Sequence, residues 1–122
     1  MSAKQLPHQH CKEDLNPESF CSVLSRTEDF ERISDIFKQL GDPTRTRIFW
    51  LLCHCEECVI NIAAMMDMSS PAVSHHLRML KNTGLINSRR EGKEVFYKAA
   101  DTAIANLLHK MIEQVMKVTC PE

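Results

Sequence analysis

The chain has 122 residues, a length that suits one domain with a modest core, which dimerisation would help to stabilise. Its apolar content of 43% and charged content of 25% are typical of a globular protein. No run approaches the roughly 18 to 20 apolar residues of a transmembrane helix, and the N-terminus lacks the apolar segment of a secretory signal. We therefore expect a cytoplasmic protein, whose six cysteines are thiols or metal ligands rather than disulfides.

The N-terminal part divides into an arm and the start of a domain. Residues 1–26 are predicted to be a flexible arm, because the polar stretch that opens it carries two prolines and shows no apolar periodicity. Residues 27–118 are predicted to form one domain. An amphipathic helix should end at Gly41, with its apolar residues at helical spacing: Phe30, Ile33, Phe37 and Leu40. The next helix should begin with Asp42 as N-cap and Pro43 in its first turn.

Residues 58–84 have the pattern of two helices joined by a short turn. Apolar residues recur at helical spacing up to Met66, and Asp67 then interrupts the pattern. Ser69 is placed as the N-cap of a second helix that Gly84 ends. The inward stripe of this second helix is Val73, Leu77 and Leu80. Such a pair predicts a helix-turn-helix.

A basic surface is predicted on the second helix and on the hairpin that follows. The outer side of the helix is expected to carry Ser70, Ser74, His75, Arg78 and Lys81, and the residues predicted to bind DNA also include Ser69 and His76. Two β-prone runs then flank a polar turn, residues 89–93, which predicts a wing with Arg89, Arg90 and Lys93 facing DNA. Residues 75–98 hold six Lys/Arg against two Glu, whereas the rest of the chain has nine against fourteen acidic residues. This asymmetry suits a protein that approaches phosphates with one face, although a solvated surface is the alternative. The same choice between phosphate contact and solvated surface applies to Arg45 and Arg47.

A last amphipathic helix is expected to begin at Asp101. Its apolar stripe is Ile104, Leu107, Leu108, Met111, Ile112 and Val115. One small domain offers too little surface to cover so wide a stripe. We therefore predict that this helix and the first helix form the interface of a two-fold homodimer, which would match a two-fold operator.

Three thiols, Cys53, Cys55 and Cys58, lie within six residues, directly before the helix-turn-helix. Soft ligands held so close together suit a thiophilic metal. Cys55 and Cys58 could face one ion if a helix starts between them, and Cys53 could join if the chain turns at His54-Cys55. Two alternatives remain: Cys53 is a buried helix residue, or thiols of this cluster form a disulfide that releases DNA. On the last helix His109 and Glu113, four residues apart, are either a chelating pair or ordinary surface.

Several of these motifs resemble the ArsR/SmtB family of bacterial metal-sensing repressors over about residues 28–117. The matching runs are Leu40-Gly41-Asp42-Pro43-Thr44-Arg45, Ala72-Val73-Ser74-His75-His76-Leu77-Arg78-Met79-Leu80, Gly84-Leu85-Ile86 and Arg89-Arg90-Glu91-Gly92-Lys93. The resemblance implies a mainly α-helical, homodimeric winged helix-turn-helix with a small β-hairpin. It also implies release from operator DNA when a metal or metalloid binds.

The resemblance further implies a ligand set. The family's cysteine box falls on residues 56–61, where Cys58 is kept but Ile60 and Asn61 replace the second Cys and the Asp. Cys53 and Cys55 lie upstream, and Cys11 on the arm could close the shell, as N-terminal cysteines do in cadmium- and lead-sensing relatives. The expected effector is Cd(II), Pb(II), As(III) or Zn(II). The family's other site, across the dimer, falls on Asp101, Ala103, Gln114 and Lys117, where three of the four ligands are missing.

Other classes of function are less well supported. The chain has no glycine-rich phosphate loop, no nucleophile elbow and no His-Glu-x-x-His pair, so we expect no enzyme. A protein-interaction module remains as an alternative to a DNA-binding protein.

Overall fold

The structure is a computed structural model that describes residues 6–8 and 16–117. The chain divides into two units, Met1–Ser34 and Asp35–Glu122. The first contains α1 (Pro17–Leu24) and most of α2 (Thr27–Gln39), whose last residues belong to the second. Helix α1 lies within residues 1–26, for which the sequence predicted a flexible arm and no helix. Its N-cap Asn16 accepts a hydrogen bond from the Glu18 amide at 3.0 Å, and this local cap marks the start of a helix that has no readable apolar period.

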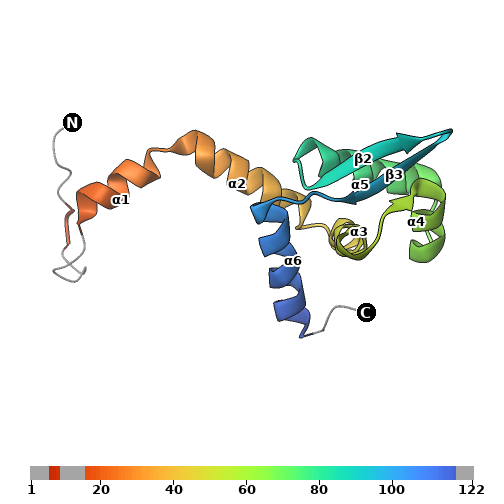
Figure 1. The fold of residues 1–122 in the computed structure, drawn as a ribbon. Helices are drawn as coiled ribbons and strands as arrows, with labels where there is room; N and C mark the ends of the chain where they lie inside the picture. The colour runs from red at the N-terminus through yellow and green to blue at the C-terminus, as the bar shows by residue number, and fades with distance from the viewer. Residues whose placement is uncertain (1–5, 9–15, 118–122) are drawn as a thin grey trace. The chain divides into compact units, whose positions relative to one another are not determined.

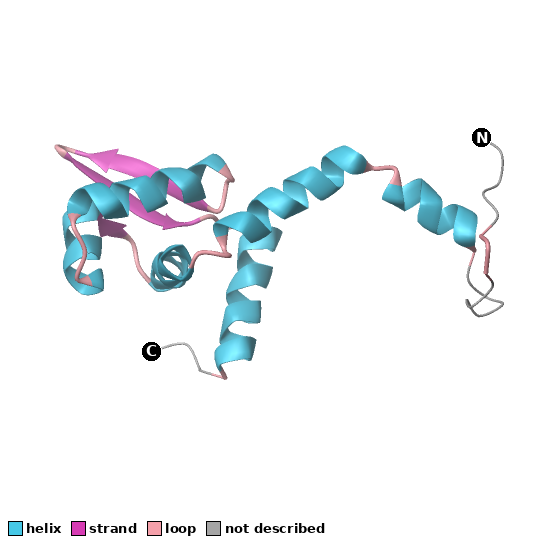
Figure 2. Cartoon of the chain, turned by 180° about the vertical axis from the view of Figure 1, so that it is seen from behind, coloured by secondary structure: helices cyan, strands magenta, loops and turns pink. Residues whose placement is uncertain are grey.

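The second unit is a winged helix-turn-helix, as predicted (Figure 1). Three antiparallel strands lie side by side in the order β1-β3-β2 (Figure 2). The elements are α3 (Pro43–His54), β1 (Glu57–Cys58), α4 (Val59–Met66), α5 (Ser70–Asn82), β2 (Ile86–Glu91), β3 (Glu94–Ala99) and α6 (Ala103–Met116). None of the helices in the described ranges is long and apolar enough to cross a bilayer.

Local signals determine where these helices begin and end. Asp42 caps α3 by accepting from the Arg45 amide at 2.9 Å, and Ser69 caps α5 by accepting from the Ala72 amide at 3.3 Å. Asp67, with φ of 54°, adopts the left-handed conformation that ends α4. These boundaries confirm the predicted helix–turn–helix order, in which residues 67–69 separate the two helices.

The sheet differs from the predicted hairpin in two respects. Only Gly92 and Lys93 form the turn, where Gly92 has φ of +63°, so Arg89 and Arg90 are strand residues. A two-residue turn with positive φ follows the twist of the flanking strands better than the longer turn predicted. Strand β1 was not expected, because two residues carry no readable period. It places Cys58 opposite Phe96 on β3.

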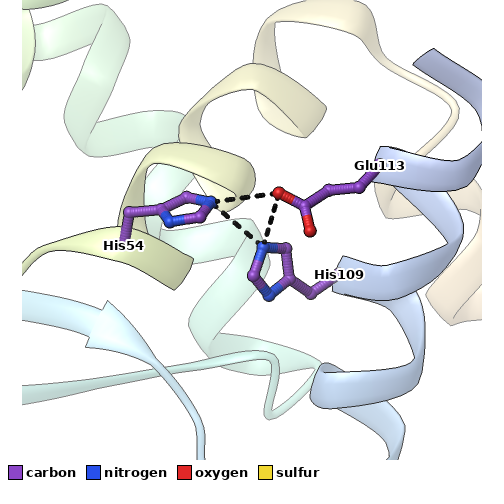
Figure 3. A group of neighbouring side chains, drawn as sticks. All are labelled: His54, His109 and Glu113. Carbon is purple, nitrogen blue, oxygen red and sulfur yellow. Dashed lines mark hydrogen bonds and ion pairs between the residues drawn. The ribbon is translucent and has the colours of Figure 1, made fainter. Parts of the chain in front are cut away.

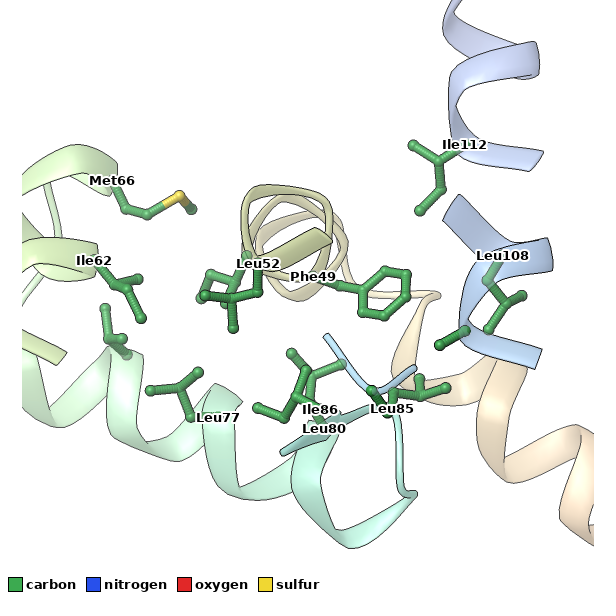
Figure 4. Packing of buried hydrophobic residues seen from close by; sticks show 14 of the residues in the cluster. Phe49, Leu52, Ile62, Met66, Leu77, Leu80, Leu85, Ile86, Leu108 and Ile112 are labelled. Atoms are coloured by element: carbon green, nitrogen blue, oxygen red, sulfur yellow. The ribbon is translucent and has the colours of Figure 1, made fainter. Parts of the chain in front are cut away.

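One hydrophobic core joins α3, α4, α5, the sheet and α6. Its largest fully buried side chains are Phe49, Ile48, Leu52, Ile62, Leu77, Leu80, Leu85, Ile86 and Val73. Phe49 on α3 points towards Leu108 and Ile112 on α6, which are 6% and 8% exposed (Figure 4). The prediction that the α6 stripe has no cover within one chain was therefore wrong for these two. Its other apolar residues are exposed: Ile104, Leu107, Met111 and Val115.

Candidate functional site

Helix α5 presents most of the residues predicted to read DNA. Its inward residues Val73, Leu77 and Leu80 are at most 1% exposed, so the opposite face is turned outward by the helical period. The exposed residues of the predicted set are Ser69, Ser70, His75, Arg78 and Lys81, and Ser74 is half-buried. The Lys81 ammonium donates to the Ser88 hydroxyl of β2 at 2.6 Å, which links this face to the wing.

His76, which was predicted to contact DNA or to pack at the surface, faces α3. Its Nδ1 accepts a hydrogen bond from Arg45 Nε at 3.4 Å. Burial lowers the pKa of His76, and the Arg45 charge acts in the same direction, although Asp42 opposes them. Arg45 is itself buried and donates to the Gln39 side chain at 2.5 Å. Arg45 and His76 therefore join α2, α3 and α5, and Arg45 is not surface available to a phosphate.

In the wing, Arg89 is engaged by neighbouring protein groups. Its guanidinium forms ion pairs with Glu56 at 2.5 Å and Glu91 at 2.6 Å, and lies 4.9 Å from the centre of the Phe96 ring. Hydrogen bonds to these carboxylates raise the pKa of Arg89, and the bond to Arg89 lowers the pKa of Glu56. The Glu56 pair ties the wing to the segment between α3 and α4.

Arg90 and Lys93 are the wing cations placed best for a phosphate. Both are exposed, and Lys93 lies in the two-residue turn at the tip. Arg90 Nε donates to the Gly92 carbonyl at 3.3 Å.

The predicted metal-binding thiols lie on three different local structures. Cys53 is half-buried in the last turn of α3, Cys55 is the C-cap of that helix, and Cys58 is buried in β1 as the N-cap of α4. Helix α3 ends at His54, and Cys55 has an extended backbone. In the described part of the chain, however, no group of three potential ligands within 4.8 Å of one another includes a thiol. Cys11 lies outside the described residues.

The local chemistry also disfavours a preformed thiolate at Cys55. Its Sγ donates to the Leu51 carbonyl at 3.4 Å. Burial, and secondarily the charge of Glu57, raises the pKa of Cys55. A raised pKa keeps the proton on sulfur, and metal binding must remove it.

One group of three potential ligands does converge among the described residues, and it combines His54 with His109 and Glu113 (Figure 3). The sequence identified the pair on α6 but not its partner on α3, because 55 residues separate His54 from His109. A cavity of about 300 Å³ adjoins the two histidines. Its lining also includes Cys53 and Cys55.

The comparisons with known proteins agree with this architecture. The family "Bacterial regulatory protein, arsR family" matches residues 42–88, from the N-cap of α3 into β2. The transcriptional repressor SmtB homolog of Synechocystis sp. is 36% identical over 87 residues, which are 71% of this chain and 66% of that protein. The cadmium resistance transcriptional regulatory protein CadC of Listeria innocua is 40% identical over 81 residues, 66% of this chain and 68% of that protein.

The chain thus spans about two-thirds of the length of these curated relatives. Among solved structures, a homodimeric winged helix-turn-helix DNA-binding domain from Mycobacterium bovis has a TM-score of 0.69 and 27% identity. The similarity covers 75% of this chain and 84% of that one.

Proposed function

The chain belongs to the arsR family of bacterial regulatory proteins, which are transcriptional regulators and not enzymes, and we propose that it is a metal-responsive repressor. It binds operator DNA in the cytoplasm as a homodimer and leaves when a soft ion binds. The observation that carries this proposal is helix α5: it is capped by Ser69, anchored by three fully buried residues and exposed along Ser70, His75 and Arg78.

In this proposal α5 enters the major groove and the wing follows the backbone. Arg78 has the exposure and the planar donor group needed to bind a guanine edge with two hydrogen bonds. Arg90 and Lys93 neutralise phosphates beside it and supply affinity without sequence preference. Arg89 contributes less, because Glu56 and Glu91 already satisfy its guanidinium.

The homodimer uses the face of α6 that the core leaves uncovered. Leu107 and Val115 are 67% and 76% exposed, and Ile104 and Met111 lie on the same helix. Apolar side chains in contiguous exposed positions are typical of an interface. A two-fold axis beside α6 would place two copies of α5 on consecutive half-sites of an operator.

The proposed effector is Cd(II), Pb(II), As(III) or Zn(II), with Cys53, Cys55, Cys58 and Cys11 as ligands. The similarity to CadC, a cadmium resistance transcriptional regulatory protein, supports a metal effector. Among the described residues no three ligand atoms within 4.8 Å of one another include a thiol, so an ion that binds Cys53, Cys55 and Cys58 together would move the segment between α3 and α4. That segment pairs with β3 through Cys58 and binds the wing through Glu56, so its movement would reach the DNA-binding surface. A disulfide among the same thiols is the alternative trigger.

Operator binding by the reduced protein tests the proposal. We expect Arg78→Ala to cost about 1–3 kcal/mol and to relax sequence preference, because a base contact is lost. Lys93→Ala should weaken all sequences alike and reduce the salt dependence. Lys110→Ala, an exposed cation on α6, is the matched control and should bind as wild type. If Arg78→Ala and Lys93→Ala both match this control, α5 and the wing do not contact DNA.

A further inference from the structure

Three side chains from two helices meet at one point between α3 and α6 (Figure 3). His54 Nε2 lies 3.0 Å from His109 Nε2, and the Glu113 Oε2 atom lies 3.5 Å from the first and 3.3 Å from the second. The side chains are only 15–19% exposed, so the group is shielded but still reachable from solvent.

These distances match the edges of a metal coordination shell. Zinc binds imidazole nitrogen at about 2.0–2.1 Å in tetrahedral geometry, which places neighbouring ligand atoms about 3.3–3.4 Å apart. The three observed distances between ligand atoms, 3.0, 3.3 and 3.5 Å, scatter around that value. Small shifts of side chains would bring the atoms to equal distances from one ion, without movement of either helix.

The ligand types also suit a borderline divalent cation. Two neutral imidazoles and one carboxylate form a set that zinc accepts in proteins, with a fourth position for water. The cavity of about 300 Å³ beside His54 and His109 gives space for that fourth ligand. Lys110 and Lys117 line a pocket together with Glu113 and reduce the attraction for a dication, so we expect moderate affinity.

We propose that His54, His109 and Glu113 bind a divalent cation of the zinc class within one protomer. The site is separate from the thiols and does not depend on the proposed function. It connects the end of α3 to the middle of α6. Because His54 lies between Cys53 and Cys55, an ion here would also hold the backbone that carries these two thiols.

A titration of the reduced full-length protein with Co(II), which reports its coordination in the visible spectrum, tests this site. Trp50 is the only tryptophan of the chain, and its ring lies 4.5 Å from the His54 ring. We expect one Co(II) per protomer to quench Trp50 fluorescence and to give visible bands of nitrogen and oxygen ligation. Any thiolate-to-metal absorbance from Co(II) on the cysteines should disappear in Cys58→Ser while the Trp50 quenching remains, and Zn(II) should displace the cobalt.

The variants separate this site from the cysteines. Glu113→Gln keeps the shape of the side chain, and we expect it and His109→Ala to weaken Co(II) binding at least tenfold, since loss of a supporting group alone costs about 10–100-fold. Gln114→Ala, the exposed neighbour, and Cys58→Ser should bind as wild type. Far-UV circular dichroism would verify folding. Wild-type affinity in both ligand variants overturns the proposal, and so does loss of the Trp50 quenching in Cys58→Ser.

Discussion

Leu107 and Leu108 are neighbours on α6, but truncation of each should damage a different property. Leu108 is 6% exposed and packs in the core of its own protomer, whereas Leu107 is 67% exposed. Leu108→Ala creates a cavity and should lower the free energy of unfolding by about 2–5 kcal/mol. Since domains of this size are stable by only about 5–15 kcal/mol, this is a severe loss.

Leu107→Ala should instead weaken the dimer. The change removes the side-chain carbons whose full burial would contribute about 2 kcal/mol, at about 0.8 kcal/mol per methylene. Because about two-thirds of the Leu107 side chain is exposed in the protomer, about 1.5 kcal/mol of this free energy can come from burial in the dimer interface. A two-fold interface contains the residue twice, so the total is about 3 kcal/mol, or about 100-fold in the dissociation constant of the dimer.

Sedimentation equilibrium measures dimer dissociation, and urea unfolding at several protein concentrations separates protomer stability from assembly. We expect Leu108→Ala to lower stability at every concentration. Leu107→Ala should matter only where the wild type is dimeric. A dissociation constant of Leu107→Ala within about threefold of wild type would refute the assignment of this face to the interface. An unaffected unfolding free energy in Leu108→Ala would contradict its burial in the core.

Three further predictions concern the effector, the wing and pH. Cys58→Ser should bind operator normally but resist release by cadmium, lead or arsenite in a DNA-binding assay, whereas Cys120→Ser should respond as wild type. Arg89→Ala should reduce operator affinity less than Lys93→Ala, measured at equal salt, because carboxylates already hold the Arg89 guanidinium. Since the folded state lowers the pKa of His76, protonation favours unfolding. The free energy of unfolding should therefore fall as the pH drops below about 6.5, the ordinary histidine pKa, and should stop falling once the pH is below the lowered pKa of His76 in the folded state. His76→Gln should flatten that part of the pH profile, measured by urea unfolding.

Much of the helix-turn-helix was readable from local chemistry. The caps at Asp42 and Ser69 and the stripe Val73, Leu77 and Leu80 depend on interactions within a few residues, so their positions follow from sequence order. The exposed side of α5 then follows from helical geometry. This is why most of the α5 residues that were predicted to contact DNA are exposed.

The tertiary structure decided which side chains meet across elements. Only the packing of α3 against α5 turns His76 inward to Arg45, and only the sheet brings Arg89 to Glu56. Helix α6 follows the same rule. Its apolar period predicts an apolar stripe, but only the packing of the core decides that Leu108 is buried and Leu107 is exposed.

The candidate ligands show this division most clearly. Closeness in sequence suggested Cys53, Cys55 and Cys58 as one site, yet each lies on a different local structure. His54 is 55 residues from His109, and the folded chain places their nitrogens 3.0 Å apart. Spacing along a chain limits distance only within one helix or turn, so the approach of α3 to α6 had to come from packing of the shared core.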